Sequence, residues 1–191
     1  MAGSFYRLGI EPKREVLEKV YEISRDHPRH LVRIFQYGFH EGTNRWFEIQ
    51  EYARNGTLTD FLKNHTISPV QFRTIVTDIT QALQALHENQ ILHLDLKPSN
   101  ILIRSVSPLN VILTDFGIST LLSVDLSRQI TATKGTPKYW APEQLGNVVG
   151  KEADYWALGV ICLEIIQNCH PFEGMNHNMV LSTLSTQGIA V

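Results

Sequence analysis

The sequence predicts an α+β fold with a small lobe that contains a sheet and a larger, mostly helical lobe. Strand-like runs come early, at 31–39 and 45–52, and long apolar helical patterns follow them. The chain has 191 residues, of which 43% are hydrophobic, so it can bury a real core. Its formal net charge of −2 indicates no overall attraction to nucleic acid or to an anionic membrane.

The first predicted element is a helix that follows Pro12, in the run KREVLEKVYEIS. Proline is favoured in the first turn of a helix, and Val16, Val20 and Ile23 recur on one face. We expect the helix to end before the His27-Pro28 pair, because the residue before a proline avoids the helical conformation.

Two strands are predicted next, at 31–39 and 45–52, and a turn at 41–44 joins them. After a break in the apolar pattern, Thr57 is a candidate cap for a short helix that reaches Leu62.

The clearest helix begins at Ser68-Pro69, where a capping serine precedes a proline at the first helical position. Its apolar residues recur at intervals of three and four and form one continuous face. They are Phe72, Ile75, Val76, Ile79, Ala82, Leu83 and Leu86.

Short β-branched runs at 101–103 and 111–113 predict two strands that flank a turn. A long polar segment occupies 119–138, and a second apolar helix is predicted from about Glu152 to Asn168. The most apolar part of that helix is about a dozen residues long, whereas a bilayer needs roughly 20. We therefore interpret it as a buried core helix.

The sequence predicts a cytoplasmic protein without a membrane segment. The first residues lack an apolar run of signal-peptide length. The two cysteines, Cys162 and Cys169, would lie two helical turns apart, roughly 10 Å, which is too far for a disulfide. Unpaired thiols are typical of a reducing compartment.

Four segments appear in a fixed order: 93–100 (HLDLKPSN), 115–117 (DFG), 135–143 (GTPKYWAPE) and 154–159 (DYWALG). In this order they closely resemble the protein-kinase family, in which they form the catalytic loop, the metal-binding motif, the P+1 loop and the start of the central helix. The lysine two residues after the catalytic aspartate, together with Gly-Thr-Pro-x-Tyr, resembles the serine/threonine branch.

The resemblance implies a role for each polar residue of these segments. Asp95 would accept or orient the proton of the substrate hydroxyl, and Lys97 would face the γ-phosphate of ATP. Asn100 and Asp115 would supply the hard oxygen ligands that Mg²⁺ prefers. Thr136 would bridge Asp95 and Lys97. Such residues suit phosphoryl transfer, which depends mainly on positioning and on neutralising charge.

The resemblance also implies a structural role for His93. It is similar to the family's buried histidine, which packs near Phe116 and is tethered by Asp154.

The nucleotide base would bind beside the run FEIQEYA at 47–53. By resemblance, Gln50 occupies the gatekeeper position. The Glu51 carbonyl and the Ala53 amide would hydrogen-bond adenine, and Leu102 would lie under the adenine ring. Residues 1–53 then form a partial small lobe with one helix, two strands and the hinge, and residues 54–191 form the large lobe without its final helices.

The chain departs from the family at its start. It contains no Gly-x-Gly-x-x-Gly and no Val-Ala-x-Lys, and the strand lysine would fall near Ser4. Its usual glutamate partner is either Glu18 or Glu15. We therefore expect a catalytic domain truncated at both ends, with only two strands in the small lobe and an unpaired sheet edge.

The catalytic loop departs from the family at Leu94, where many kinases carry arginine. That arginine gathers a phosphorylated activation loop. Without it, we expect activity that does not depend on phosphorylation of Thr131 or Thr133.

The sequence thus favours an ATP- and Mg²⁺-dependent kinase that phosphorylates serine or threonine of a protein substrate, without a role for nucleic acid. A catalytically impaired kinase-like binding module or scaffold is the alternative. A small-molecule phosphotransferase shares the chemistry, but the segment 135–143 argues against it because in protein kinases this loop docks a peptide.

Overall fold

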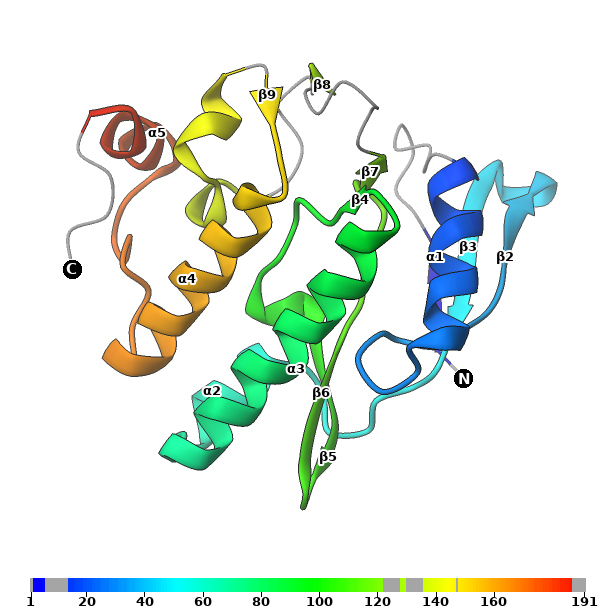
Figure 1. Cartoon of the computed structure of the whole chain (residues 1–191), viewed down its shortest axis with the longest axis horizontal. Helices are drawn as coiled ribbons and strands as arrows, with labels where there is room; N and C mark the ends of the chain where they lie inside the picture. The colour runs from blue at the N-terminus through cyan, green and yellow to red at the C-terminus, as the bar shows by residue number, and fades with distance from the viewer. Residues whose placement is uncertain (1, 6–13, 122–127, 130–135, 147, 187–191) are drawn as a thin grey trace.

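A computed structural model of the chain describes residues 2–5, 14–121, 128–129, 136–146 and 148–186. A three-stranded antiparallel sheet and one helix lie at one side of the molecule, and the longer helices lie at the other (Figure 1). The sheet contains β1 (Ala2–Phe5), β2 (Ile34–His40) and β3 (Arg45–Gln50), in the order β1-β3-β2. This agrees with the predicted α+β class.

The expectation of only two strands in the small lobe is wrong, because the described residues include a third strand, β1, and the order β1-β3-β2 leaves β1 and β2 as the outer strands. β1 pairs with β3 along its whole length, from Ala2 opposite Gln50 to Phe5 opposite Phe47. The sequence AGSF carries little strand signal of its own, so β1 depends on the neighbouring strand for its hydrogen bonds. Ser4, the position predicted for the strand lysine, lies opposite Glu48.

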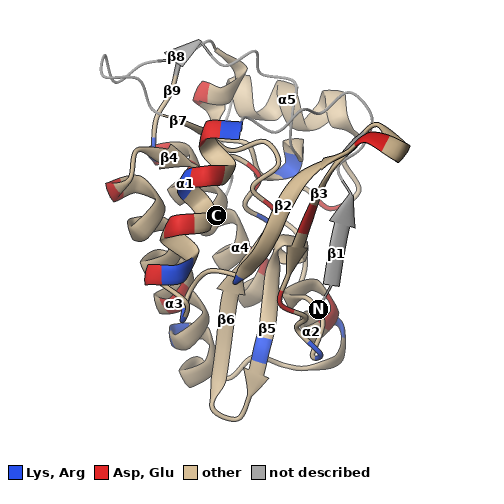
Figure 2. Cartoon of the chain, turned by 90° about the vertical axis from the view of Figure 1, so that its right-hand side faces the viewer, with Lys and Arg blue, Asp and Glu red and all other residues tan. Residues whose placement is uncertain are grey.

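Helix α1 (Arg14–Asp26) buries the face that the sequence predicts, with Val16, Val20 and Ile23 almost completely inaccessible. It ends before His27, as expected, whereas Pro12 lies outside the described residues. Acidic and basic residues occur along its length, as the colours of the ribbon show (Figure 2).

The predicted helix caps are confirmed. Thr57 caps α2 (Leu58–Asn64) by accepting a hydrogen bond from the Asp60 amide, and the Asp60 carboxylate accepts one from the Thr57 amide in return. Ser68 forms the same capping box with Gln71 at the start of α3 (Pro69–Glu88).

The large lobe is built on α3 and α4 (Glu152–Gln167), which pack against each other, and α3 also packs against a β-hairpin. Both predicted strands of this hairpin are present, and each is longer than expected. The hairpin consists of β5 (Ile101–Val106) and β6 (Leu109–Leu113). The remaining elements are β4 (Ile91–Leu92), η2 (Pro98–Asn100), β7 (Thr120–Leu121), β8 (Arg128–Gln129), η3 (Pro137–Tyr139), η4 (Pro142–Leu145), β9 (Val148–Val149) and α5 (His177–Thr186); η1 (Glu41–Thr43) forms the turn between β2 and β3.

One hydrophobic core joins the two lobes, because residues of α1 and the loop after it belong to the same buried cluster as α3, β5, β6 and α4. Backbone hydrogen bonds reinforce this junction. The Val32 amide donates to the Leu113 carbonyl at 2.9 Å, and the Leu113 amide donates to the His30 carbonyl at 2.9 Å.

Cys162 and Cys169 are both free thiols, which confirms that they form no disulfide with each other. No helix among the described residues is long and apolar enough to cross a membrane.

Candidate active site

The three residues predicted for catalysis and the predicted metal ligand Asn100 form one hydrogen-bonded cluster around the Asp95 carboxylate. Lys97 Nζ donates to Asp95 Oδ2 at 2.7 Å and to Thr136 Oγ1 at 2.9 Å. Thr136 Oγ1 donates in turn to Asp95 Oδ1 at 3.1 Å. Asn100 Nδ2 donates to Asp95 Oδ2 at 3.1 Å and to the Asp95 carbonyl at 2.9 Å. Three side chains therefore fix the orientation of one carboxylate.

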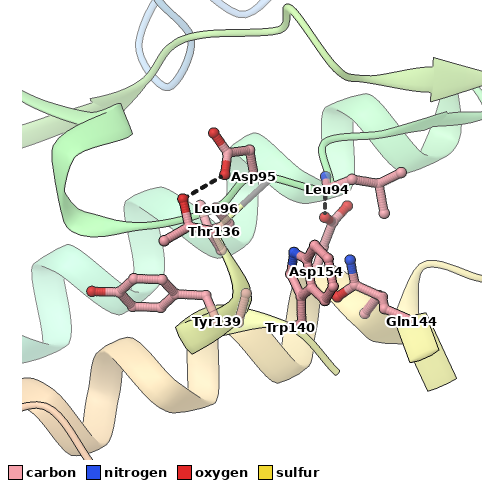
Figure 3. A pocket seen from close by; sticks show the side chains of 10 residues that line it. Leu94, Asp95, Leu96, Thr136, Tyr139, Trp140, Gln144 and Asp154 are labelled. Carbon is pink, nitrogen blue, oxygen red and sulfur yellow. Dashed lines mark hydrogen bonds between the residues drawn. The ribbon is translucent and has the colours of Figure 1, made fainter. Parts of the chain in front are cut away.

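This cluster is partly shielded from water, since the side chains of Asp95 and Lys97 are 10% and 22% exposed. Figure 3 shows Asp95 and Thr136 facing each other, with Tyr139 and Trp140 below them. The short helix η2 turns Asn100 back towards Asp95, because the backbone amide of Asn100 donates to the Lys97 carbonyl at 2.9 Å. Asp95, Lys97 and Asn100 therefore come together through local chain geometry, whereas Thr136 is brought in from a distant segment.

Buried His93 holds the loop from behind. Its Nδ1 accepts a hydrogen bond from the Asp95 amide at 3.2 Å, so its Nε2 carries the proton that is donated to the Thr114 carbonyl at 3.1 Å. Its ring packs edge-on against Phe116, with ring centroids 5.5 Å apart. The predicted packing of His93 against Phe116 is present.

Asp154 is the tether that the sequence predicts, and it acts on the backbone of the loop. Its carboxylate is buried and accepts hydrogen bonds from the amides of His93 at 2.9 Å and Leu94 at 2.8 Å. Figure 3 shows it reaching the Leu94 amide. His87 at the end of α3 also contacts it, with Nε2 at 2.8 Å. Leu94 has a positive φ of 64°, which is uncommon for a residue with a side chain. The three bonds to Asp154 help to hold this conformation.

The two predicted metal ligands lie on neighbouring segments. The Thr114 amide donates to the Asn100 carbonyl at 3.0 Å, so Asp115 directly follows a residue that is bonded to Asn100. Asp115 is exposed, and its φ of 65° differs from that of a regular strand. Because Asn100 Nδ2 is bonded to Asp95, its amide oxygen is the atom available to a metal.

These donors fit Mg²⁺ bound to a nucleotide. Among the described residues, no group of three or more His, Cys, Asp or Glu side chains is arranged to hold a metal. Mg²⁺ needs no such cage, since it is usually held by one or two protein oxygens together with substrate phosphates and waters.

The residues predicted to bind the nucleotide base lie where β3 meets the large lobe. Gln50 at the end of β3 accepts a hydrogen bond from the Thr114 hydroxyl at 2.9 Å. The Ala53 carbonyl accepts from the Gly56 amide at 3.2 Å. Leu102 in β5 is half-buried and pairs with Thr57 through an isolated bridge.

Comparison with known proteins agrees with this geometry. A family model described as protein kinase domain matches residues 14–189. The chain belongs to the protein kinase domain family.

Three curated relatives are similar to this kinase domain. It is 30% identical over 180 residues to the serine/threonine-protein kinase shk1/pak1 of Schizosaccharomyces pombe, covering 93% of this chain and 27% of the relative. It is 35% identical over 153 residues to the serine/threonine-protein kinase PrkC of Bacillus subtilis, covering 79% and 23%. It is 29% identical over 179 residues to the serine/threonine-protein kinase PAK 1 of Mus musculus, covering 93% and 32%. The chain thus spans between 23% and 32% of the length of these relatives.

Several sequence predictions for the kinase domain stay open. Glu18 Oε1 accepts a hydrogen bond from Arg14 Nε, on the same helix, at 2.8 Å. The Glu15 side chain is exposed. These contacts do not choose between the two glutamates as partner of a lysine. Thr131 and Thr133 lie outside the described residues.

The sequence reasoning missed a partly buried polar group at η3 of the kinase domain. The Tyr139 hydroxyl donates to Glu164 Oε2 at 2.8 Å. Burial raises the pKa of the Tyr139 phenol, with the Glu164 charge adding to it, and burial also raises the pKa of Glu164. Burial, reinforced by the charge of Lys138, lowers the pKa of His170 to about 4. No local pattern signals this group, since its members are brought together by the packing of α4 against η3.

Proposed function

We propose that this domain is an ATP- and Mg²⁺-dependent protein kinase that transfers the γ-phosphate to serine or threonine of a protein substrate. The observation that carries the proposal is the Asp95 carboxylate, which is held by Lys97, Asn100 and Thr136 together. Protein kinases generally use ATP and Mg²⁺. The printed names of the relatives are those of serine/threonine-protein kinases, which supports the choice of acceptor.

In the proposed reaction, the substrate hydroxyl oxygen attacks the γ-phosphorus and the bond to the β–γ bridging oxygen breaks, so that ADP leaves. The hydroxyl proton passes to Asp95. Lys97, beside Asp95, is a fixed cation that would face the transferring phosphoryl group, whose negative charge it offsets. Bound Mg²⁺ would neutralise phosphate charge, and Asn100 and Asp115 are the residues that would hold it. Thr136 holds the Asp95 carboxylate and the Lys97 ammonium group in fixed positions, because its hydroxyl is bonded to both.

For the nucleotide base, we propose the site between β3 and β5. The Glu51 carbonyl and the Ala53 amide would hydrogen-bond adenine, Gln50 would lie at the back of the site, and Leu102 would pack under the ring. Residues 1–53 and 54–191 would be the two lobes that enclose it.

The proposal places the protein in the cytoplasm, where ATP and Mg²⁺ are available. Both cysteines are free thiols, which suits that compartment. The net charge of −2 supports a protein substrate over a nucleic acid.

The test is a thermal unfolding experiment with ATP and Mg²⁺, paired with transfer of labelled phosphate to a generic basic protein. At a hundredfold excess over Kd, ligand adds about 2.7 kcal/mol. For a chain of this size, this raises Tm by about 5–10 °C. Asp115→Asn should abolish the Mg²⁺-dependent part of the shift. Asp95→Asn should keep the shift and lose phosphate transfer. Asp26→Asn, which changes an exposed carboxylate at the end of α1, is the matched control.

A folded, unaltered chain that shows neither a shift nor transfer would reject the enzyme. That result would favour the alternative, a kinase-like binding module. One feature already points that way, since β1 carries Ser4 opposite Glu48 and contains no lysine. Transfer to small alcohols in place of protein would instead indicate a small-molecule phosphotransferase.

A further inference from the structure

Arg104 on β5 makes an ion pair with Glu51, the residue that directly follows β3. Arg104 Nε donates to Glu51 Oε2 at 3.2 Å, and Nη2 donates to Glu51 Oε1. The two side chains are 26% and 24% exposed, so the pair is largely removed from water. A two-pronged contact of this kind fixes direction as well as distance, which a lysine could not do.

The same guanidinium also binds the loop that follows α1. Nη1 donates to the carbonyls of Pro28 and, at 3.3 Å, of Arg29, and Nη2 donates to the Leu31 carbonyl at 3.3 Å. One side chain of the large lobe therefore joins two segments of the small lobe. These segments are more than 50 residues away from Arg104 in the sequence.

The segment that follows β3 is attached at both of its ends. At the first end, the Glu51 amide donates to the Arg33 carbonyl at 2.9 Å, and Glu51 Oε1 accepts from the Arg33 amide at 3.0 Å. At the other end, Asn55 Nδ2 donates to the Arg104 carbonyl at 3.2 Å, and the Ile103 amide donates to the Gly56 carbonyl at 2.9 Å. Residues 52–54 span the distance between these two anchors.

We propose that Arg104 is a positioning residue, which holds the backbone of residues 51–53 in the conformation that binds the nucleotide base. None of the bonds described above uses the Glu51 carbonyl or the Ala53 amide, so both groups remain available to a base. The nucleotide part of this proposal rests on the proposed function. The structural part, that Arg104 orders the segment, does not.

The structural part is tested by hydrogen exchange on the whole chain. Arg104→Gln removes the charge and the fork of donors, and Arg73→Gln removes an exposed arginine of α3 as the matched control. We expect the Glu51 and Gly56 amides to exchange at least about tenfold faster in Arg104→Gln alone, because local opening is then less costly. Exchange equal to that of the control would overturn the proposal.

The nucleotide part is tested with two probes, adenosine and magnesium tripolyphosphate. We expect Arg104→Gln to weaken adenosine binding about tenfold, as loss of a charge-assisted contact would. Binding of magnesium tripolyphosphate should be unchanged, because this probe does not reach residues 51–53. Equal weakening of both probes would mean general loosening and would overturn the positioning role. So would adenosine affinity that stays unchanged or rises.

Two further variants keep the test sharp. Glu51→Gln added to Arg104→Gln should cause no further loss of adenosine affinity, because the two side chains act as one unit. Should Arg104→Gln not fold, Arg104→Lys keeps the charge without the fork and should give a smaller loss in the same direction. A folded, unaltered chain that binds no adenosine would refute the proposed function and the nucleotide part together, and hydrogen exchange would still decide the structural part.

Discussion

Replacement of the buried Asp154 carboxylate should destabilise the domain more than replacement of any exposed carboxylate. Asp154 is 1% exposed. Its carboxylate accepts hydrogen bonds from the amides of His93 and Leu94, and His87 Nε2 contacts the same carboxylate. Asp154→Ala leaves both amides buried without an acceptor. Each such group costs about 1–3 kcal/mol.

The pocket beside Asp154 narrows the range expected for the decrease in the free energy of unfolding. Asp154 and Leu94 line a small pocket of about 10 Å³, next to the Asp95 cluster. After truncation to alanine, this space would be large enough for a water molecule that satisfies part of the loss. We therefore expect a decrease in the free energy of unfolding of about 2–4 kcal/mol. Asp154→Asn keeps one acceptor oxygen and should lose about half as much.

Urea unfolding followed by circular dichroism measures this prediction. With a slope of about 2 kcal/mol per molar urea, Asp154→Ala should lower the midpoint by about 1–2 M. Glu152→Ala, an exposed carboxylate in the same helical turn, is the control and should cost less than about 1 kcal/mol. A loss below about 0.5 kcal/mol for Asp154→Ala, or equal losses for alanine and asparagine, would refute the reasoning.

Two further predictions concern stability. Thr57→Ala should cost about 1 kcal/mol because it removes the cap of α2, whereas Thr59→Ala in the same turn should cost clearly less; equal costs in urea unfolding would contradict the capping argument. Burial lowers the pKa of His170 to about 4, so between about pH 6.5 and pH 4 the unfolded chain binds a proton at this residue that the folded chain does not bind. The contribution of His170 to the free energy of unfolding should therefore be fully present above about pH 6.5 and decrease as the pH falls towards 4. His170→Gln should remove up to about 1.4 kcal/mol per pH unit of this slope, and a slope that does not change would exclude His170 as its source.

Local chemistry explains what the sequence predicts well. The caps at Thr57 and Ser68 each depend on a residue three positions further on, so both halves of the capping box are visible in the sequence. Likewise Asp95, Lys97 and Asn100 lie within six residues, and a single short turn brings them together. In such cases the spacing along the chain already fixes the geometry.

Contacts that depend on packing were not predicted. β1 carries a weak strand signal and exists because β3 offers it an edge. The Arg104–Glu51 pair joins residues that are 53 positions apart, and the local sequence around either residue does not predict it. Each miss is a case in which tertiary neighbours decide the role of a residue.

The predicted site residues are also connected through a residue that no motif singled out. The Thr114 amide donates a hydrogen bond to the Asn100 carbonyl, and the Thr114 carbonyl accepts one from His93 Nε2. The Thr114 hydroxyl donates a third to the side chain of Gln50. It therefore fixes the segment of Asp115 relative to the catalytic loop and to the end of β3 at the same time. Because all three bonds come from one buried residue, these segments cannot shift independently without leaving a polar group unpaired. The order of the motifs along the chain identifies the participants, and Thr114 explains why they hold a common geometry.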